Sequence, residues 1–191
     1  MVMRISIPNH LICLLLALGL EASPQAARIS LPPGLPTAAG VYYQKSDTQW
    51  TKVDPAPMGN SKMRGMNTFL QTEGLAGLNM SFEYWGAYAA LQIPERRPVF
   101  LARGIGAAQD ALIISLTPKN HNRAVQTTSS DMTAENKGGF KKKDVRKVIT
   151  TACSDGSFSI TPIEDLKPGE YILVFGNANG AFDFGISPAK K

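Results

Sequence analysis

Residues 165–187 read DLKPGEYILVFGNANGAFDFGIS, and this stretch decides the fold class. It contains two alternating apolar runs, one over Tyr171–Phe175 and one over Phe182–Ile186. Between them stands Asn179-Gly180, a dipeptide typical of the tight turn that joins two antiparallel strands. The pattern predicts a β-hairpin. Because both alternating sets of its first strand are apolar, we expect that strand to be covered on both faces.

A proline and a glycine before this hairpin predict a sharp corner. Pro168 fixes its own φ, and Gly169 can adopt the positive φ that a tight turn requires. Tyr171 then begins the strand, and in immunoglobulin-like sandwiches a tyrosine in this position bonds back to the main chain across the corner. We therefore assign Pro168, Gly169 and Tyr171 a structural role.

Short apolar runs and turn signals alternate along the rest of the chain at intervals of roughly 8–12 residues, which is typical of an all-β fold. Strands are expected near residues 41–43, 50–53, 79–85, 88–93, 98–104, 110–117, 123–128, 144–152 and 157–163, with a short helix near residues 67–72. From Pro98 onward no segment has a sustained helical period. The prediction is an all-β protein, an antiparallel Greek-key β-sandwich of immunoglobulin-like type with an N-terminal β-hairpin extension.

The first residues have the features of an export leader. A basic opening, Met1–Arg4, precedes the apolar run LICLLLALGL at residues 11–20. This run is shorter than the roughly 20 apolar residues that span a bilayer, and it matches the core of a signal peptide, about 7–15 residues. Cleavage is expected after one of three alanines, Ala22, Ala26 or Ala27. We therefore expect a periplasmic or extracellular protein with no membrane span after leader cleavage.

These patterns divide the chain into five parts. They are a signal peptide (1–27), a Pro/Gly-rich linker (28–39), an N-terminal hairpin segment that packs on the main domain (40–73), the β-sandwich domain (74–187) and a short tail (188–191).

The two cysteines have different expected fates. Cys13 lies inside the apolar run of the leader and not at a cleavage site, which disfavours a lipoprotein. Once the leader is removed, Cys153 is alone, so an internal disulfide is excluded. An unpaired cysteine of this kind is usually buried and unreactive.

The formal net charge is +5, and part of the positive charge is concentrated in FKKKDVRKV at residues 140–148. An Arg-Arg pair between two prolines adds a second basic turn. The candidate binding residues are therefore Arg96, Arg97, Lys141, Lys142, Lys143, Arg146 and Lys147. Outside the cell we expect an envelope protein or an anionic envelope polymer as partner, and not nucleic acid. The alternative is a solvated strand end kept basic to deter pairing between sheet edges.

A second group of candidates is aromatic. SFEYWGAY at residues 81–88 supplies Tyr84, Trp85 and Tyr88, side chains on which sugar rings can stack. The alternative binding site is therefore a carbohydrate site built on these three residues. Aromatic side chains on strands are also common in protein cores, so their exposure decides between the two interpretations.

Signals for catalysis or for a cofactor are weak. After leader removal His121 is the only histidine, and it lies in PKNHNR, which reads as an exposed turn. No nucleotide-binding, metalloprotease or nucleophile-elbow motif is present. Acidic candidates for sugar hydrolysis are Glu73, Glu83, Glu95 and Asp110, and candidate thioether ligands for Cu(I) are Met58, Met63 and Met66. Surface charge and core filling explain both sets more simply, so we expect no metal, no cofactor and no enzyme.

The order of these pieces resembles a group of uncharacterised secreted bacterial β-domains. The shared features are a GVYY hairpin (40–43), RPVFLARG…DALIISLTPKNHNRAVQ (97–126) and LKPGEYILV…FDFGI (166–186), and together they cover most of residues 40–187. The resemblance implies a β-sandwich of the cell envelope and implies no activity. The expected function is thus an exported, non-enzymatic accessory or interaction domain. The carbohydrate- or polymer-binding module is the alternative, and the oligomeric state stays open.

Overall fold

The computed structural model describes residues 34–64, 78–133, 138–176 and 180–188. Over these ranges the protein is all-β, as predicted, with two short 3-10 helices and no α-helix. No helix within these ranges is long and apolar enough to cross a membrane. The signal peptide, the first half of the linker, the predicted helix near residues 67–72, the boundary at residues 73–74, Asn179 and most of the tail lie outside the described residues.

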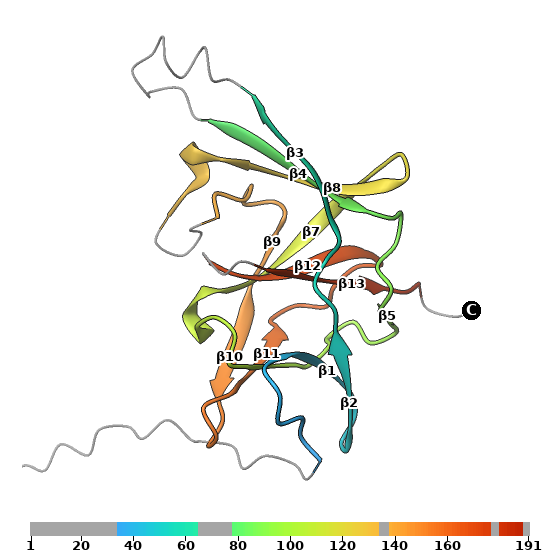
Figure 1. Ribbon diagram of the computed structural model, residues 1–191, viewed down its shortest axis with the longest axis vertical. Helices are drawn as coiled ribbons and strands as arrows, with labels where there is room; N and C mark the ends of the chain where they lie inside the picture. Colours follow the sequence, from blue (N-terminus) through green and yellow to red (C-terminus); the bar gives the residue numbers. More distant parts are fainter. Residues whose placement is uncertain (1–33, 65–77, 134–137, 177–179, 189–191) are drawn as a thin grey trace, which may run out of the picture.

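The first sheet has five antiparallel strands in the order β10-β11-β6-β1-β2 (Figure 1). Their bounds are β1 Gly40–Ser46, β2 Gln49–Val53, β6 Phe100–Arg103, β10 Val148–Ala152 and β11 Phe158–Pro162. The N-terminal hairpin β1–β2 is an integral part of this sheet, because β1 pairs with β6 on its other side.

The second sheet follows the order β3-β4-β8-β7-β12-β13-β5. Its strands are β3 Met58–Arg64, β4 Asn79–Trp85, β5 Gln92–Ile93, β7 Ala111–Lys119, β8 Asn122–Thr128, β12 Gly169–Phe175 and β13 Ala181–Ile186. A short strand, β9 Val145–Arg146, also pairs with β7. All pairs are antiparallel except β13–β5, which is parallel.

The core lies between the two sheets. Apolar side chains of β1, β6 and β11 meet those of β7, β12 and β13 in one large cluster. Phe184 is at its centre, with its ring 4.8 Å from that of Phe100 and stacked at 5.6 Å on that of Tyr171. The opposite face of β12 contributes Ile172 and Val174 to a second cluster, so this strand is covered on both faces, as expected.

The second cluster forms because the second sheet divides at β7. The first part of β7, Ala111–Leu116, pairs with β12, and the last part of β7, Thr117–Lys119, pairs with β8. Strands β3, β4 and β8 therefore form an outer extension at the upper end of the molecule (Figure 1). This extension packs Tyr84 and Val125 onto the back of β12.

Two tyrosines hold chain corners by the same local contact. Tyr171 donates its hydroxyl hydrogen to the carbonyl oxygen of Lys167 at 2.8 Å, which is the bond expected at this corner. Tyr42 does the same to Ala38 at 3.0 Å, in the first strand of the chain. The second corner was not expected from the sequence.

Strand predictions agree best where the pattern alternates clearly. The strand predicted at 79–85 coincides with β4. The strand predicted at 88–93 is reduced to β5, because Glu170 accepts the amide of Ala89 at 2.6 Å and holds the preceding segment as a loop. Strand β3 was not expected.

Candidate functional site

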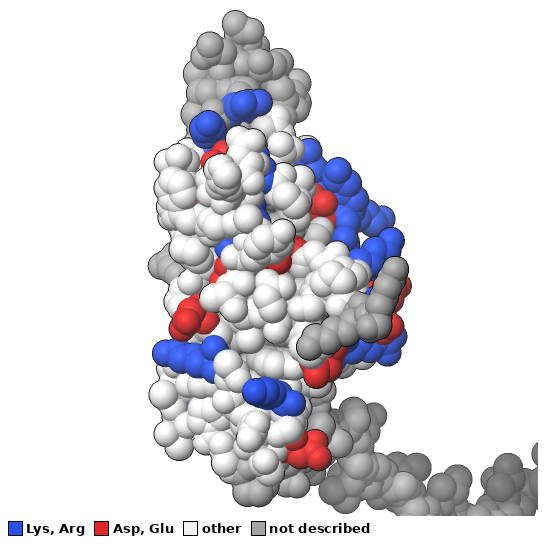
Figure 2. Space-filling view, turned by 90° about the vertical axis from the view of Figure 1, so that its right-hand side faces the viewer, with Lys and Arg blue, Asp and Glu red and all other residues white. Residues whose placement is uncertain are grey.

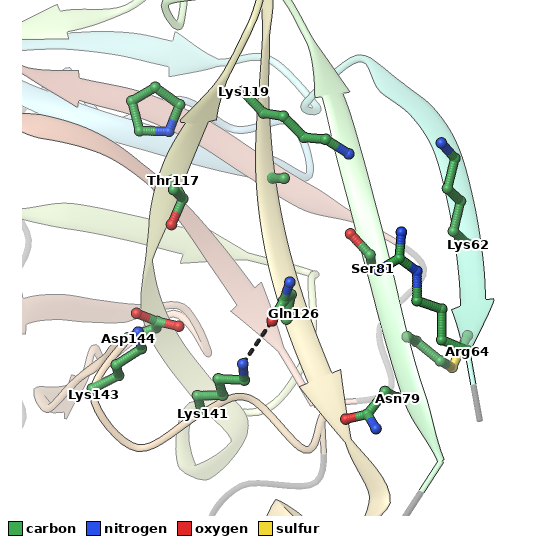
Figure 3. A pocket seen from close by; sticks show the side chains of 13 residues that line it. Lys62, Arg64, Asn79, Ser81, Thr117, Lys119, Gln126, Lys141, Lys143 and Asp144 are labelled. Carbon is green, nitrogen blue, oxygen red and sulfur yellow. Dashed lines mark hydrogen bonds between the residues drawn. The ribbon is translucent and has the colours of Figure 1, made fainter. Parts of the chain in front are cut away.

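A hollow of about 610 Å³ lies on the outer extension of the second sheet. We call it the basic groove, because five cationic side chains line it: Lys62, Arg64, Lys119, Lys141 and Lys143. Its floor carries the shorter side chains of Asn79, Ser81, Thr117 and Gln126 (Figure 3), and Ala124 also lines it.

Strand register brings these side chains to one face. In the pairing of β3 with β4, Lys62 lies opposite Ser81 and Arg64 lies opposite Asn79. Ser81 in turn lies opposite Gln126 of β8. Since directly opposed residues point to the same face of a sheet, these strands place cations at the rim and short polar groups across the floor.

The hollow exists because β7 and β8 diverge. They pair only over Thr117–Lys119 of β7. Farther along β8, Thr127 pairs instead with Phe140, through an isolated antiparallel bridge. The amide of Thr128 donates to the carbonyl oxygen of Gly139 at 2.8 Å and fixes the chain there. The groove therefore opens in the fork between the two strands.

The chain after Phe140 forms the wall opposite β3. Lys141 donates to the Oε1 atom of Gln126 at 2.6 Å, which extends its side chain over the floor (Figure 3). The amide of Ser115 donates to the carbonyl oxygen of Asp144 at 2.8 Å, so the segment is bound to β7 as well as to β8. Lys141 and Lys143 thus face Lys62 and Arg64 across the hollow.

The groove has a strong excess of positive charge. Asp144 is the one acidic side chain that lines it, against five cations. Within the described part of the chain, only Lys119 of these five forms an ion pair, which it makes with Glu83. The space-filling view shows Lys and Arg side chains gathered along one side of the upper half of the molecule (Figure 2). This arrangement attracts anions.

Glu83 is the acidic neighbour at the end of the groove. The hydrogen bond from Lys119 lowers the pKa of Glu83 below its ordinary value, and this effect, with the charge of Lys62, outweighs the opposing effect of burial. The ionised pair therefore stabilises the fold above the ordinary pKa of a glutamate, and this contribution is lost as the pH falls through the lowered pKa. At neutral pH the Glu83 carboxylate is therefore ionised.

The other predicted basic residues do not join the groove. Arg146 and Lys147 line a second hollow of about 410 Å³ with a third cation, Lys167, and two acidic residues, Glu164 and Asp165, so its charge is more nearly balanced. Arg97 pairs with Asp165 at 2.7 Å on the surface. Arg96 and Lys142 are exposed and line neither hollow.

The aromatic candidates divide into buried and exposed residues. Tyr84 is only 4% exposed and belongs to the second core cluster, so it is not part of a surface platform. Trp85 and Tyr88 are 52% and 76% exposed. A Cβ atom on Gly59 would lie 3.2 Å from the indole of Trp85, so the bare backbone of Gly59 supports one side of that ring.

A buried ion cluster, which sequence reasoning missed, anchors the loop that presents Trp85 and Tyr88. Arg123 is fully buried, and its Nη1 atom lies 2.7 Å from the Oδ2 atom of Asp183 and 3.4 Å from the Oε2 atom of Glu170. The same guanidinium donates to the carbonyl oxygens of Trp85 at 2.9 Å and of Gly86 at 3.0 Å. These hydrogen bonds from the buried guanidinium fix the backbone of the loop at Trp85 and Gly86 from the protein interior.

Three of the catalytic candidates, His121, Glu83 and Glu95, have different surroundings. His121 lies in the exposed turn between β7 and β8, as predicted. Glu83 pairs with Lys119, whereas Glu95 accepts a hydrogen bond from Tyr43. The described residues contain no group of three or more side chains suited to a metal ion. Glu73 and Met66, and the side chain of Met63, lie outside the described part, and Met58 is exposed on β3.

Cys153 is buried, as predicted. It packs with Tyr42 and Leu101 on the outer side of the first sheet.

Comparison of the chain with protein-family models, with curated proteins and with solved structures finds no match to any of them.

Proposed function

We propose that this protein is an exported, non-enzymatic envelope domain that binds an anionic polymer in the basic groove. One observation carries the proposal: three separate segments of the chain place five cations around a single open, polar hollow. We also propose that the two-sheet body belongs to the Greek-key, immunoglobulin-like class, which the corner tyrosine Tyr171 supports.

The shape of the groove favours a chain-like anion. Lys62 and Arg64 stand on one side, and Lys141 and Lys143 stand on the other, so successive charges of a polymer meet cations on both sides (Figure 3). The floor adds hydroxyl and amide groups that hydrogen-bond to oxygen atoms of the ligand. Anionic envelope polymers that carry phosphate or carboxylate groups have this chemistry.

The test compares two double variants of equal charge in binding to fluorescently labelled polyphosphate. K141M/K143M removes two groove cations, and K142M/K147M removes two cations outside the groove. At about 1 kcal/mol per cation near a charged surface, we expect the first pair to weaken binding by roughly 30-fold.

The control pair is expected to have a much smaller effect. The logarithm of the wild-type affinity is expected to fall linearly with the logarithm of the salt concentration, with a shallower slope for the groove variant. Equal losses for the two double variants would refute the groove as the binding site.

A second candidate function is carbohydrate binding at Trp85 and Tyr88. The observation that favours it is the pair of exposed aromatic rings on a loop fixed from below by Arg123, since a preorganised loop lowers the entropy cost of binding. Neutral oligosaccharides are expected to change the fluorescence of Trp85, and this change is expected to persist at high salt. A W85A variant that still binds the same oligosaccharides would contradict this function.

A further inference from the structure

We propose that β10 is the site of self-association, where it pairs antiparallel with β10 of a second copy of the chain. Among the described residues β10 pairs only with β11, so it forms one end of the five-stranded sheet. The other edge of the strand presents main-chain donors and acceptors that suit a further strand.

The composition of β10 is unusual for a free edge. Its sequence, Val148–Ala152, reads VITTA and contains no charge, no proline and no glycine. Its register with β11 is continuous from Val148 to Ala152, without a bulge. Charges, prolines and bulges are the features with which natural proteins prevent edge-to-edge pairing, and β10 has none of them.

The other three sheet ends carry such features. Strand β2 contains Lys52, and its pairing with β1 has a register shift. Strand β3 contains Lys62 and Arg64, and its pairing with β4 is also shifted. Strand β5 has only two residues and is followed by Pro94. The contrast singles out β10 as the one described sheet end that lacks protection.

Exposed apolar side chains lie beside this edge. Ile149 is 57% exposed and lies opposite Thr161 of β11. Ile163, two residues beyond Thr161, is 42% exposed. Ile163 follows the last residue of β11, where its amide donates to the carbonyl oxygen of Lys147 at 3.0 Å, so both exposed apolar side chains lie near the start of β10.

The strand is complementary to itself, which favours a second copy over an unrelated partner. With a twofold axis at Thr150, Val148 lies opposite the partner's Ala152, and Ile149 lies opposite the partner's Thr151. Only this register overlaps all five residues of the strand. It places two Thr150 side chains together and sets the two Ile149 side chains on one diagonal, and both kinds of cross-strand contact are favourable.

Charge agrees with this arrangement. Arg146 and Lys147 precede β10, and Asp155, in the turn that follows it, pairs with Arg103 of its own copy. Antiparallel pairing therefore keeps the basic ends of the two strands apart and places each beside a turn whose charge is already balanced. The pairing joins two five-stranded sheets into one continuous sheet and leaves the basic groove of each copy open.

The first test is sedimentation velocity of the purified protein over a range of concentrations. The wild type is expected to reach a dimer, and I149K is expected to weaken self-association by about tenfold or more, because the two lysines would be diagonal neighbours. T51K, on the opposite end of the same sheet, is the matched control and is expected to leave self-association unchanged. A wild type that stays monomeric, or equal effects of I149K and T51K, would overturn the proposal.

The second test probes the register and does not depend on the stability of I149K. In a C153S background, T150C is expected to form a disulfide-linked dimer under mild oxidation, because the two Thr150 positions face each other across the twofold axis. T51C in the same background is expected to form no disulfide-linked dimer. Equal cross-linking at the two positions would exclude pairing through β10.

Discussion

Tyr171 shows how one side chain fixes a corner of the fold. Its ring stacks on Phe184 in the core, and its hydroxyl reaches back to the carbonyl oxygen of Lys167. Burial raises the pKa of this hydroxyl, so it stays protonated and a hydrogen-bond donor at neutral pH.

We expect Y171F to lower the free energy of unfolding by about 0.5–1.5 kcal/mol, because one intramolecular hydrogen bond is lost while the ring still packs. The measurement is the midpoint of thermal unfolding. Y88F, at a highly exposed position, removes the same atom and is expected to leave the midpoint unchanged. A wild-type midpoint for Y171F would show that the corner bond does not contribute.

Arg123 is the most consequential buried charge in the described structure. R123M removes the guanidinium that pairs with Glu170 and Asp183, and it leaves these two buried carboxylates without their cationic partner. We expect a loss of about 3–5 kcal/mol in the free energy of unfolding, measured by denaturant titration.

The matched control for this prediction is R97M. Arg97 and Asp165 form an ion pair on the surface, where such pairs contribute about 0–1 kcal/mol. Similar losses for R97M and R123M would show that the buried cluster has no special role.

For single residues, the sequence predicts the structural role of those whose contacts come from neighbouring positions in the chain. Tyr171 follows a proline–glycine corner, so its role is readable, and the burial of Cys153 follows from its lack of a partner. Arg123 was missed because it stands directly after an exposed turn, in a context typical of a surface residue. Its partners, Glu170 and Asp183, come from β12 and β13, and sequence spacing does not reveal that meeting.

Among the loops and strands, one glycine is fixed by a tight contact between elements. Gly106 has a φ of +60°, and a Cβ atom there would lie 2.4 Å from the Cβ atom of Phe175 on β12. Gly156, in the turn between β10 and β11, has a φ of +82° and no atom within 4 Å of the same position.

We therefore expect G106A to destabilise the protein more than G156A. Both variants incur the left-handed backbone cost of about 1–2 kcal/mol, and G106A adds about 1–3 kcal/mol for overpacking against Phe175. Denaturant titration of the two variants measures the difference. Equal destabilisation would contradict the close approach of this loop to β12.

The elements themselves differ in how far their sequence predicts them. Strand β12 carries an unbroken apolar run after a turn signal, β13 alternates large apolar residues with Asp183 and Gly185, and β4 combines aromatic and alternating residues, so both regions were predicted. Strand β3 was missed because Gly59, Lys62 and Arg64 give it the composition of a loop. It forms because its main chain completes the edge of β4, a contact that depends on tertiary structure.

The whole molecule is held together by β7, which belongs to both the core and the outer extension. The two tryptophans of the protein report on opposite regions of the molecule, since Trp50 lies on β2 and Trp85 lies at the end of β4 (Figure 1). If the molecule unfolds as one unit, W50F and W85F, each with one remaining tryptophan, are expected to give coincident fluorescence transitions.

The measurement is denaturant unfolding of both variants, with circular dichroism as the common reference. Each fluorescence midpoint is compared with the circular dichroism midpoint of the same variant, which removes any effect of the substitution on stability. Separate midpoints within one variant would show that the outer extension unfolds independently of the core.

The basic groove was predictable only in part. Lys141 and Lys143 belong to a visible charge cluster, and both line the groove. Lys62, Arg64 and Lys119 come from strands distant in sequence, and their meeting depends on the fork between β7 and β8. Their neighbours in the sequence cluster lie elsewhere, because Lys142 is exposed in the turn closed by the Asp144 amide and the Lys141 carbonyl oxygen, and Lys147 follows β9 and lines the second hollow.

The shared strand β7 has a practical consequence for finding the natural ligand. A molecule that occupies the groove touches Thr117 and Lys119, whose strand continues into the centre of the protein. Occupancy is therefore linked to the melting of the entire chain. A ligand at 100 times its dissociation constant adds about 2.7 kcal/mol. A thermal-shift screen of envelope polymers thus needs no engineered reporter, since the protein's own melting temperature registers the ligand.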